Sequence, residues 1–170
     1  MQSTQSPEVQ ELDLTSEDLE ILIQALGSGA TIADVTNMQP EALEGLYTLA
    51  YNMYQAGNFD NAETLFRTMC LYKHNDRRFW LGLAGTLQAQ ERYKEAIDAY
   101  SMVGLCTSLK DPAPMFFTAQ CLLKMGDKEH AIDMLEAALF LCSEATPEHV
   151  TYKTTAQELL HMLRNKKQGA

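Results

Sequence analysis

A pattern that returns every 34 or 35 residues restricts the fold of this chain more than any other feature. Each copy has a large residue, an alanine three positions later and another large residue four positions after that. The copies are Phe59, Ala62 and Phe66, then Tyr93, Ala96 and Tyr100, and finally Lys128, Ala131 and Leu135. A second apolar pattern with helical spacing precedes each copy and contains Ala50, Ala84 or Ala119. Each copy therefore predicts a pair of helices joined by a short turn.

This arrangement is typical of the tetratricopeptide repeat (TPR), a helix–turn–helix unit of about 34 residues. The alanines fall where the two helices of a unit cross most closely, so that only a small side chain fits there. A single unit cannot bury its own apolar face, and neighbouring units stack into one continuous core. We therefore predict an all-α fold with three tandem repeats at 43–76, 77–110 and 112–145, with Asp111 inserted between the last two.

A helical region is also predicted before the repeats, over residues 15–42. The run Thr15-Ser16-Glu17-Asp18 has the form of a capping box. Four apolar residues then share one helical face: Leu19, Leu22, Ile23 and Leu26. Gly27-Ser28-Gly29 ends this helix, and Thr31 to Asn37 could form a short second one. Residues 1–14 lack any periodicity and are expected to be disordered.

The region after the repeats, 146–166, predicts one more helix. Thr146-Pro147-Glu148 suits a helix start, with proline at the first position and an acid in the first turn. The apolar residues that follow at helical spacing are Tyr152, Ala156, Leu159, Leu160 and Leu163. We expect this helix to cap the exposed face of the third repeat.

The distribution of charge excludes several classes of protein. The formal net charge is -10, and residues 1–66 contain eleven acidic side chains but no Lys or Arg. Secretory and transit signals need basic residues, and a nucleic-acid-binding face needs a basic surface. No segment approaches the roughly 18 apolar residues of a membrane span. We expect a cytoplasmic protein that neither binds nucleic acid nor inserts into a membrane.

No catalytic or metal-binding constellation is evident in the sequence. The cysteines lie in apolar helical stretches without C-x-x-C spacing, and the histidines form no recognised ligand set. These residues are Cys70, Cys106, Cys121, Cys142, His74, His130, His149 and His161. The cysteines fit small buried apolar residues, and a redox or metal role would need a nearby partner that the sequence does not supply. We expect no enzymatic activity, no metal and no cofactor.

The concave surface of a TPR array, lined by the first helix of each repeat, is the expected binding surface. The positions that face it are Glu44, Tyr47, Tyr51 and Tyr54, then Arg78, Leu81, Gly85 and Gln88, then Ala113, Phe116, Gln120 and Leu123. The three tyrosines form a stripe separate from the core stripe of Leu46, Leu49, Ala50 and Met53. This second stripe either contacts a ligand or packs against the N-terminal helices.

A groove of this composition suits an extended peptide. Apolar and aromatic side chains would accept alternate side chains of the peptide, while tyrosine hydroxyls and glutamine amides could bond its backbone. The groove does not suit an acidic peptide terminus, because Tyr47 and Tyr51 stand where a carboxylate clamp has Lys and Asn. A generic TPR adaptor for an extended peptide remains an alternative at this point.

The chain resembles a known family over roughly residues 19–165. The resemblance is carried by the run Gly27-Ser28-Gly29-Ala30-Thr31-Ile32-Ala33 and by the segment from Leu43 to Gly57, with its L-Y-T-L-A-Y core. Phe79 to Ala84 and Gln120 to Leu123 fit it as well. These stretches resemble the class II chaperones of type III secretion systems, the low-calcium-response chaperone H (SycD-like) proteins.

The resemblance implies a cytosolic bacterial chaperone that binds hydrophobic translocator proteins before export and keeps them soluble. It implies that the concave groove holds an extended segment near a translocator's N-terminus. The residues expected to bind it are Glu44, Tyr47, Tyr51, Tyr54, Leu81, Gly85, Gln88, Phe116, Gln120 and Leu123. The free protein is expected to be a homodimer through its N-terminal helices. Leu19, Leu22, Ile23 and Leu26 would form the interface, with packing onto the first repeat as the competing role.

Overall fold

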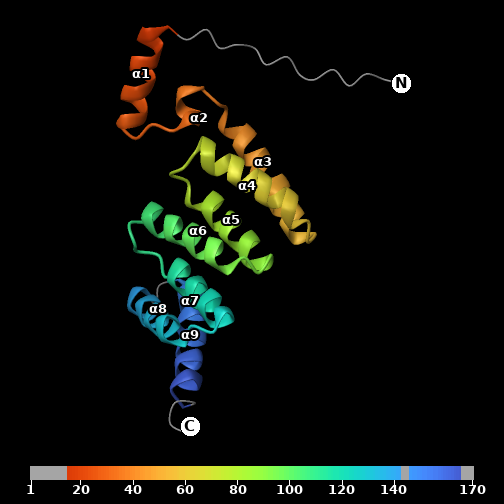
Figure 1. Cartoon of the computed structure of the whole chain (residues 1–170), viewed down its shortest axis with the longest axis vertical. Helices are drawn as coiled ribbons and strands as arrows, with labels where there is room; N and C mark the ends of the chain where they lie inside the picture. Colours follow the sequence, from red (N-terminus) through yellow and green to blue (C-terminus); the bar gives the residue numbers. More distant parts are fainter. Residues whose placement is uncertain (1–14, 143–145, 166–170) are drawn as a thin grey trace, which may run out of the picture.

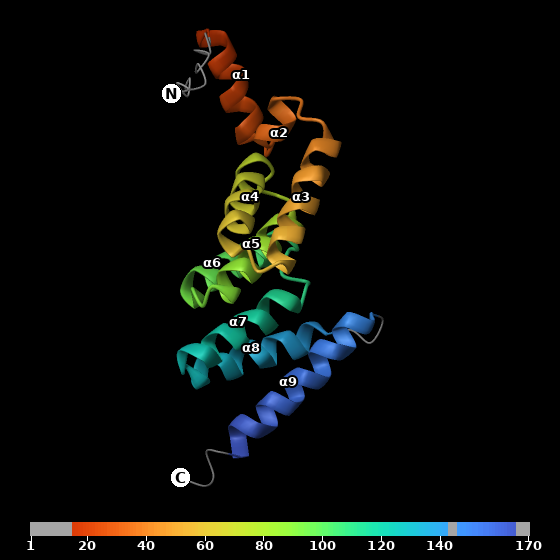
Figure 2. The same ribbon diagram turned by 90° about the vertical axis from the view of Figure 1, so that its right-hand side faces the viewer.

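The computed structural model describes residues 15–142 and 146–165, and within these ranges every regular element is a helix. The helices are α1 (Ser16–Gly27), α2 (Ile32–Val35), α3 (Pro40–Gln55), α4 (Phe59–Tyr72), α5 (Arg77–Ala89), α6 (Tyr93–Cys106), α7 (Ala113–Met125), α8 (Lys128–Leu141) and α9 (Pro147–Asn165). They stack in chain order along one long axis, with α1 at one end and α9 at the other (Figures 1 and 2). The predicted all-α repeat fold is confirmed. The predictions for residues 1–14 and for residue 166 lie outside the described residues.

The alanines of the repeat pattern lie at the closest helix contacts, as the pattern predicts. All six have no exposed surface: Ala50, Ala62, Ala84, Ala96, Ala119 and Ala131. The large residue four positions after the second alanine of each unit is also buried, with Phe66, Tyr100 and Leu135 at 1%, 2% and 0% exposure. Small and large side chains thus alternate between the stacked helices, which gives a packed interior along the whole array.

The turn inside each repeat takes a left-handed backbone conformation. Gly57 and Gly126 have φ angles of 76° and 85°, a conformation that glycine adopts without steric cost. Glu91 occupies the equivalent position of the second repeat with φ of 61°, although non-glycine residues seldom adopt this region. The second helix of each unit then begins two residues later. The same turn geometry therefore recurs with and without glycine.

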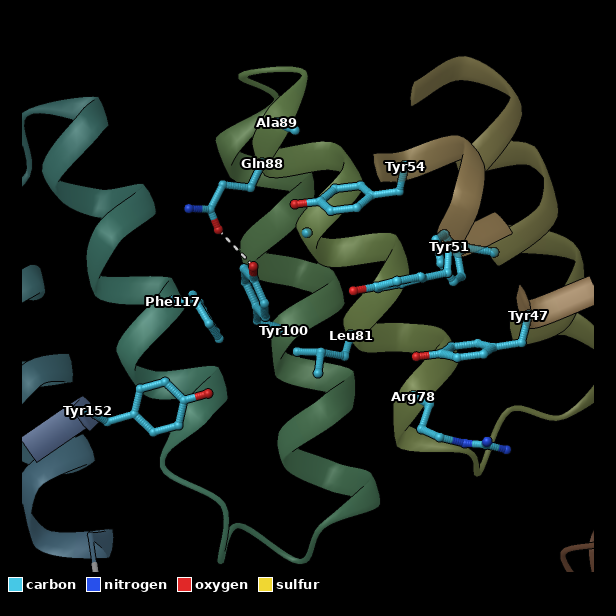
Figure 3. Close-up of a pocket in the computed structure, with 13 residues that line it drawn as sticks. Tyr47, Tyr51, Tyr54, Arg78, Leu81, Gln88, Ala89, Tyr100, Phe117 and Tyr152 are labelled. Atoms are coloured by element: carbon cyan, nitrogen blue, oxygen red, sulfur yellow. Dashed lines mark hydrogen bonds between the residues drawn. The ribbon is translucent and has the colours of Figure 1, made fainter. Parts of the chain in front are cut away.

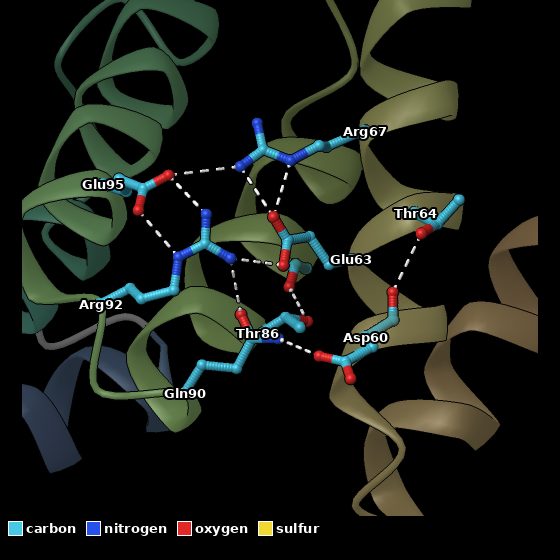
Figure 4. Close-up of polar contacts among 9 residues, drawn as sticks. Asp60, Glu63, Thr64, Arg67, Thr86, Gln90, Arg92 and Glu95 are labelled. Atoms are coloured by element: carbon cyan, nitrogen blue, oxygen red, sulfur yellow. Dashed lines mark hydrogen bonds and ion pairs between the residues drawn. The ribbon is translucent and has the colours of Figure 1, made fainter.

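A cluster of ion pairs connects the first two repeats (Figure 4). Glu63 on α4 accepts hydrogen bonds from Arg67 at 2.8 Å and from Arg92, at the start of α6, at 2.6 Å. Arg92 also pairs with Glu95 at 2.6 Å. Burial acts to raise the pKa of Glu63, but the hydrogen bonds from both arginines outweigh it and hold that pKa below its ordinary value. This carboxylate therefore joins neighbouring repeats electrostatically.

The last helix caps the third repeat. α9 packs against α8 and α7, and its Ala156 and Leu160 are buried in a cluster with Phe116 and Leu135. The partly buried residues of α9 in this cluster are Tyr152, Leu159 and Leu163. All five apolar residues predicted for this helix thus pack in the same cluster.

The other end of the stack is more open. α1 packs on α2, and α2 packs on α4. Thr31 and Asp34 form a capping box at the start of α2. Figure 2 shows α1 projecting beyond the repeats. The expected core position of Leu49 is wrong, because its side chain is 45% exposed on α3, whose packing partners are α4 and α5.

Candidate binding groove

Three tyrosines form one wall of a cavity on the inner surface of the array (Figure 3). Tyr47, Tyr51 and Tyr54 share one face of α3 because residues four and seven positions apart in a helix point the same way. The rings of Tyr47 and Tyr51 are stacked, with centroids 6.4 Å apart. Tyr51 is 48% exposed, so much of its ring is available to a ligand.

The helix opposite, α5, forms the floor of the cavity with Leu81, Gly85 and Gln88. Gly85 leaves space here, since a Cβ atom at this position would have the Tyr54 hydroxyl oxygen, 3.9 Å away, as its nearest neighbour. Tyr100 of α6, Phe117 of α7 and Tyr152 of α9 continue the wall toward the end of the array, as Figure 3 shows.

The cavity has a volume of about 480 Å³ and a largely apolar wall. Its full lining is Tyr47, Tyr51, Tyr54, Phe66, Arg78, Leu81, Gly82, Gly85, Gln88, Ala89, Tyr100, Phe117 and Tyr152. These residues come from six helices of the three repeats and the cap. The size and the mixture of aromatic walls with a few polar groups are typical of a ligand-binding site.

The polar rim of the cavity is centred on Arg78. Its guanidinium forms a two-pronged ion pair with Glu44, with bonds of 2.7 and 3.1 Å, and pairs with Asp76 at 2.8 Å. It also lies over the rings of Tyr47 and Phe79, 5.3 and 5.5 Å from their centroids. The hydrogen bond from Arg78 lowers the pKa of Glu44. The predicted residue Glu44 therefore fixes the arginine at the rim.

A short chain of hydrogen bonds crosses the floor. The Tyr100 hydroxyl donates to Gln88 Oε1 at 2.7 Å, and Gln88 Nε2 donates to Gln120 Oε1 at 3.3 Å. Tyr100 is almost fully buried, while both glutamines are half-buried. Gln120, another predicted residue, thus touches the cavity through Gln88.

The third repeat differs from the expected groove. Phe116 is only 5% exposed and packs against Tyr152, with ring centroids 5.1 Å apart, because α9 covers this position. Its neighbour Phe117 lines the cavity instead and stacks on Tyr100 at 5.5 Å. Leu123 is half-buried and lies outside the cavity lining. The expected groove position of Phe116 is therefore wrong.

The sequence prediction lacks six lining residues: Phe66, Gly82 and Ala89, and three aromatic residues of later helices, Tyr100, Phe117 and Tyr152. Tyr100 was assigned to the core because it occupies a repeat position that packs between helices. Phe117 lies next to the selected position, and Tyr152 belongs to the capping helix. The aromatic character of all three was the available signal, since aromatic residues are enriched at binding surfaces.

The apolar face of α1 is exposed where side chains can be described. Ile23 and Leu26 are 68% and 41% exposed, and Ile21 is 61% exposed. The side chains of Leu19 and Leu22 lie outside the described part of the structure. With α1 packed on α2, the exposed residues leave an apolar surface at the end of the array.

The buried cysteines are poorly suited to form thiolates. All four cysteines are free thiols, and burial raises the pKa of Cys70 to about 12 and that of Cys121 to about 11, which disfavours reactive thiolates. No cluster of His, Cys, Asp or Glu within the described ranges could hold a metal ion. In the same part of the chain, no helix combines the length and the apolar character needed to cross a membrane.

Comparison with known proteins identifies relatives of this chain. The tetratricopeptide-repeat family model matches residues 43–76 and 79–102. The low calcium response locus protein H of Yersinia pestis is 36% identical over 138 residues, which are 81% of this chain and 79% of that protein.

Solved structures agree with this relationship. A type III secretion complex from Aeromonas hydrophila superposes with a TM-score of 0.81 at 33% identity, covering 89% of this chain and 99% of that one. The translocator chaperone SycD of Yersinia enterocolitica, in complex with a peptide of the translocator YopD, superposes with a TM-score of 0.71 at 35% identity. The match covers 76% of this chain and 98% of SycD. An alternative dimer of SycD superposes with a TM-score of 0.72 at 34% identity, and the match covers 76% of this chain and 97% of that one.

Proposed function

The chain belongs to the family of the low-calcium-response protein H, the SycD-like chaperones of type III secretion, and we propose that it binds hydrophobic translocator proteins through its concave cavity. Binding would keep these partners soluble and competent for secretion. The single observation that carries this proposal is the open, largely apolar cavity between the tyrosines of α3 and the floor of α5. The relative SycD is solved with a translocator peptide, which indicates the class of ligand.

An extended segment of a translocator is the ligand that the cavity favours. Its apolar side chains would contact the aromatic walls, while hydroxyl and amide groups would bond its backbone. The residues proposed to contact the ligand are Tyr47, Tyr51, Tyr54, Leu81, Gly85 and Gln88. Glu44 would act indirectly by holding Arg78, and Gln120 would act indirectly by contacting Gln88. Leu123 stays a candidate only at the margin of the surface, and Phe116 is replaced by Phe117.

The proposed action is binding in the bacterial cytoplasm, without catalysis. A translocator with exposed apolar surface aggregates or inserts prematurely unless another protein covers that surface. A partner with a net charge of -10 keeps the complex dispersed and disfavours contact with anionic membranes and nucleic acids.

We also propose that the free protein is a homodimer through α1. The exposed side chains of Ile23 and Leu26 support this role, and the relative SycD forms dimers. Leu19 and Leu22 belong to the same predicted face. Burying this surface against a second copy would remove apolar area from water.

Co-purification from the native bacterium tests the function, with wild type, Tyr51→Ala and Phe140→Ala compared. Phe140 is a matched control, since it is an aromatic residue that is 89% exposed outside the cavity. We expect wild type and Phe140→Ala to recover a hydrophobic translocator and Tyr51→Ala to recover much less. All three should melt at similar temperatures.

Two outcomes would contradict the proposal. Recovery of soluble proteins alone would leave a generic TPR adaptor that binds another peptide. Equal recovery of the translocator by wild type and Tyr51→Ala would place its binding site outside this cavity.

A further inference from the structure

The hydrogen-bond chain on the cavity floor orients one polar group in an apolar site. Tyr100 is 2% exposed, and burial raises the pKa of its hydroxyl, which therefore stays protonated and available as a donor. Because this hydroxyl donates to Gln88 Oε1 at 2.7 Å, the amide oxygen of Gln88 is held toward α6. The amide nitrogen consequently points away from Tyr100, as Figure 3 shows.

The Gln88 nitrogen has more hydrogen-bonding capacity than the protein uses. It carries two N–H bonds, and one of them meets Gln120 Oε1 at 3.3 Å. Among the described residues the second N–H has no protein acceptor, and Gln88 lines the cavity. Water can satisfy this donor while the cavity is open. A ligand that covers it must supply an acceptor, since leaving a buried donor unpaired is costly.

We propose that Gln88 donates this hydrogen bond to a main-chain carbonyl oxygen of the bound translocator segment and thereby holds its backbone against the cavity floor, with Tyr100 as a positioning residue. The inference rests on the proposed function. An extended segment presents a carbonyl about every 3.3 Å, so such an acceptor is available whatever the sequence. The aromatic walls then select the side chains on either side of this bond.

The substitution Gln88→Glu tests the N–H donor alone, because it leaves the size and shape of the side chain nearly unchanged. Glutamate keeps an oxygen that accepts from Tyr100 but loses both N–H groups at neutral pH. Gln157→Glu on α9 is the matched control, because it makes the same charge change at an exposed residue outside the cavity. The probe is the tightest binder among overlapping peptides that cover the translocator recovered with the wild type.

We expect Gln88→Glu to weaken binding of this peptide about tenfold at pH 7.5, the loss expected for one well-placed hydrogen bond. Binding should recover in part near pH 5, because a protonated carboxyl regains an O–H donor. Tyr100→Phe should weaken binding by about threefold when it is introduced into the wild type. In a protein that already carries Gln88→Leu, it should have no effect on binding. Alanine substitution along the peptide should leave the sensitivity to Gln88→Glu in place.

The inference is overturned if Gln88→Glu binds the peptide like Gln157→Glu, or if Tyr100→Phe has the same effect in both backgrounds. It is also overturned if one peptide alanine removes the sensitivity, because the acceptor would then be a side chain. In each case the difference between wild type and Tyr51→Ala survives, so the proposed function stands. If no peptide binds the wild type, the inference fails, and co-purification with wild type and Tyr51→Ala still decides the proposed function. Melting curves show whether each variant remains folded.

Discussion

Two glycines on α5 face the same cavity and predict opposite effects when each is replaced by alanine. At Gly82, an added Cβ would lie 2.2 Å from Phe66 Cε1 and 2.5 Å from Phe66 Cζ. Carbon atoms prefer separations of about 3.5–4.0 Å, so this overlap exceeds 1 Å. The ring cannot easily retreat, because Phe66 is 1% exposed and packs edge-on against Tyr47.

The net effect at Gly82 follows from two opposing contributions. Replacing glycine by alanine inside a helix stabilises by up to about 1 kcal/mol. Overpacking a core typically costs about 1–3 kcal/mol, and an overlap with a buried ring belongs at the upper end. We therefore expect Gly82→Ala to lower the free energy of unfolding by about 2 kcal/mol, which corresponds to a Tm lower by roughly 4–8 °C for a chain of this size.

Gly85→Ala is the matched control, because its nearest neighbour would be the Tyr54 hydroxyl at 3.9 Å. Here alanine's higher helix propensity acts without a steric overlap, and we expect the variant to have a Tm about 2–4 °C above that of the wild type. Thermal melting by circular dichroism, with urea unfolding as a second measure, would separate the variants. A Gly82→Ala protein that melts at or above the wild type, or an equal loss of stability in both variants, would refute the predicted overlap with Phe66.

Three further predictions concern charge, core and assembly. The lowered pKa of Glu63 means that its stabilisation is present above its ordinary value of 4.5 and is lost as the pH falls through the folded value. The free energy of unfolding should thus fall in acid, and Glu63→Gln should reduce this fall by about 1 kcal/mol or less, measured by urea unfolding at pH values from 7 to 3. Phe116→Ala should destabilise by about 3–5 kcal/mol in urea, whereas Phe117→Ala should mainly weaken peptide binding in a titration. Ile23→Ser should shift the free protein toward monomer in sedimentation, and an unchanged dimer would exclude this face as the interface.

The repeat architecture could be predicted because its packing requires the same residue type at the same place in each unit. Ala62, Ala96 and Ala131 each sit in a helix crossing that admits no larger side chain, so the constraint is visible in the sequence. The turn at Glu91 follows from its place in the repeat, 34 residues after Gly57, although nothing in glutamate itself favours a positive φ. The period of the repeat, more than the conformational preference of any single residue, predicts where these elements lie.

The groove could be predicted only in its first two repeats. The positions of Tyr51 and Leu81 follow from helix geometry alone, because neighbouring repeats present the same face there. In the third repeat, the exposure of Phe116 depends on how α9 crosses α7, and helical periodicity contains no information about that crossing. The exposure of Leu49 likewise depends on packing, because α4 and α5, the helices that pack on α3, leave this side chain uncovered.

Capping and binding are consequently linked at one end of the groove. Tyr152 packs on Phe116 at 5.1 Å and on Phe117 at 5.8 Å, so α9 buries one aromatic ring of α7 and supports the other. Both Phe117 and Tyr152 then contribute to the cavity wall. A ligand that fills the cavity would contact the cap as well as the repeats, and its binding free energy would therefore also stabilise the docking of α9. The capping helix thus belongs to the cavity wall as much as to the core.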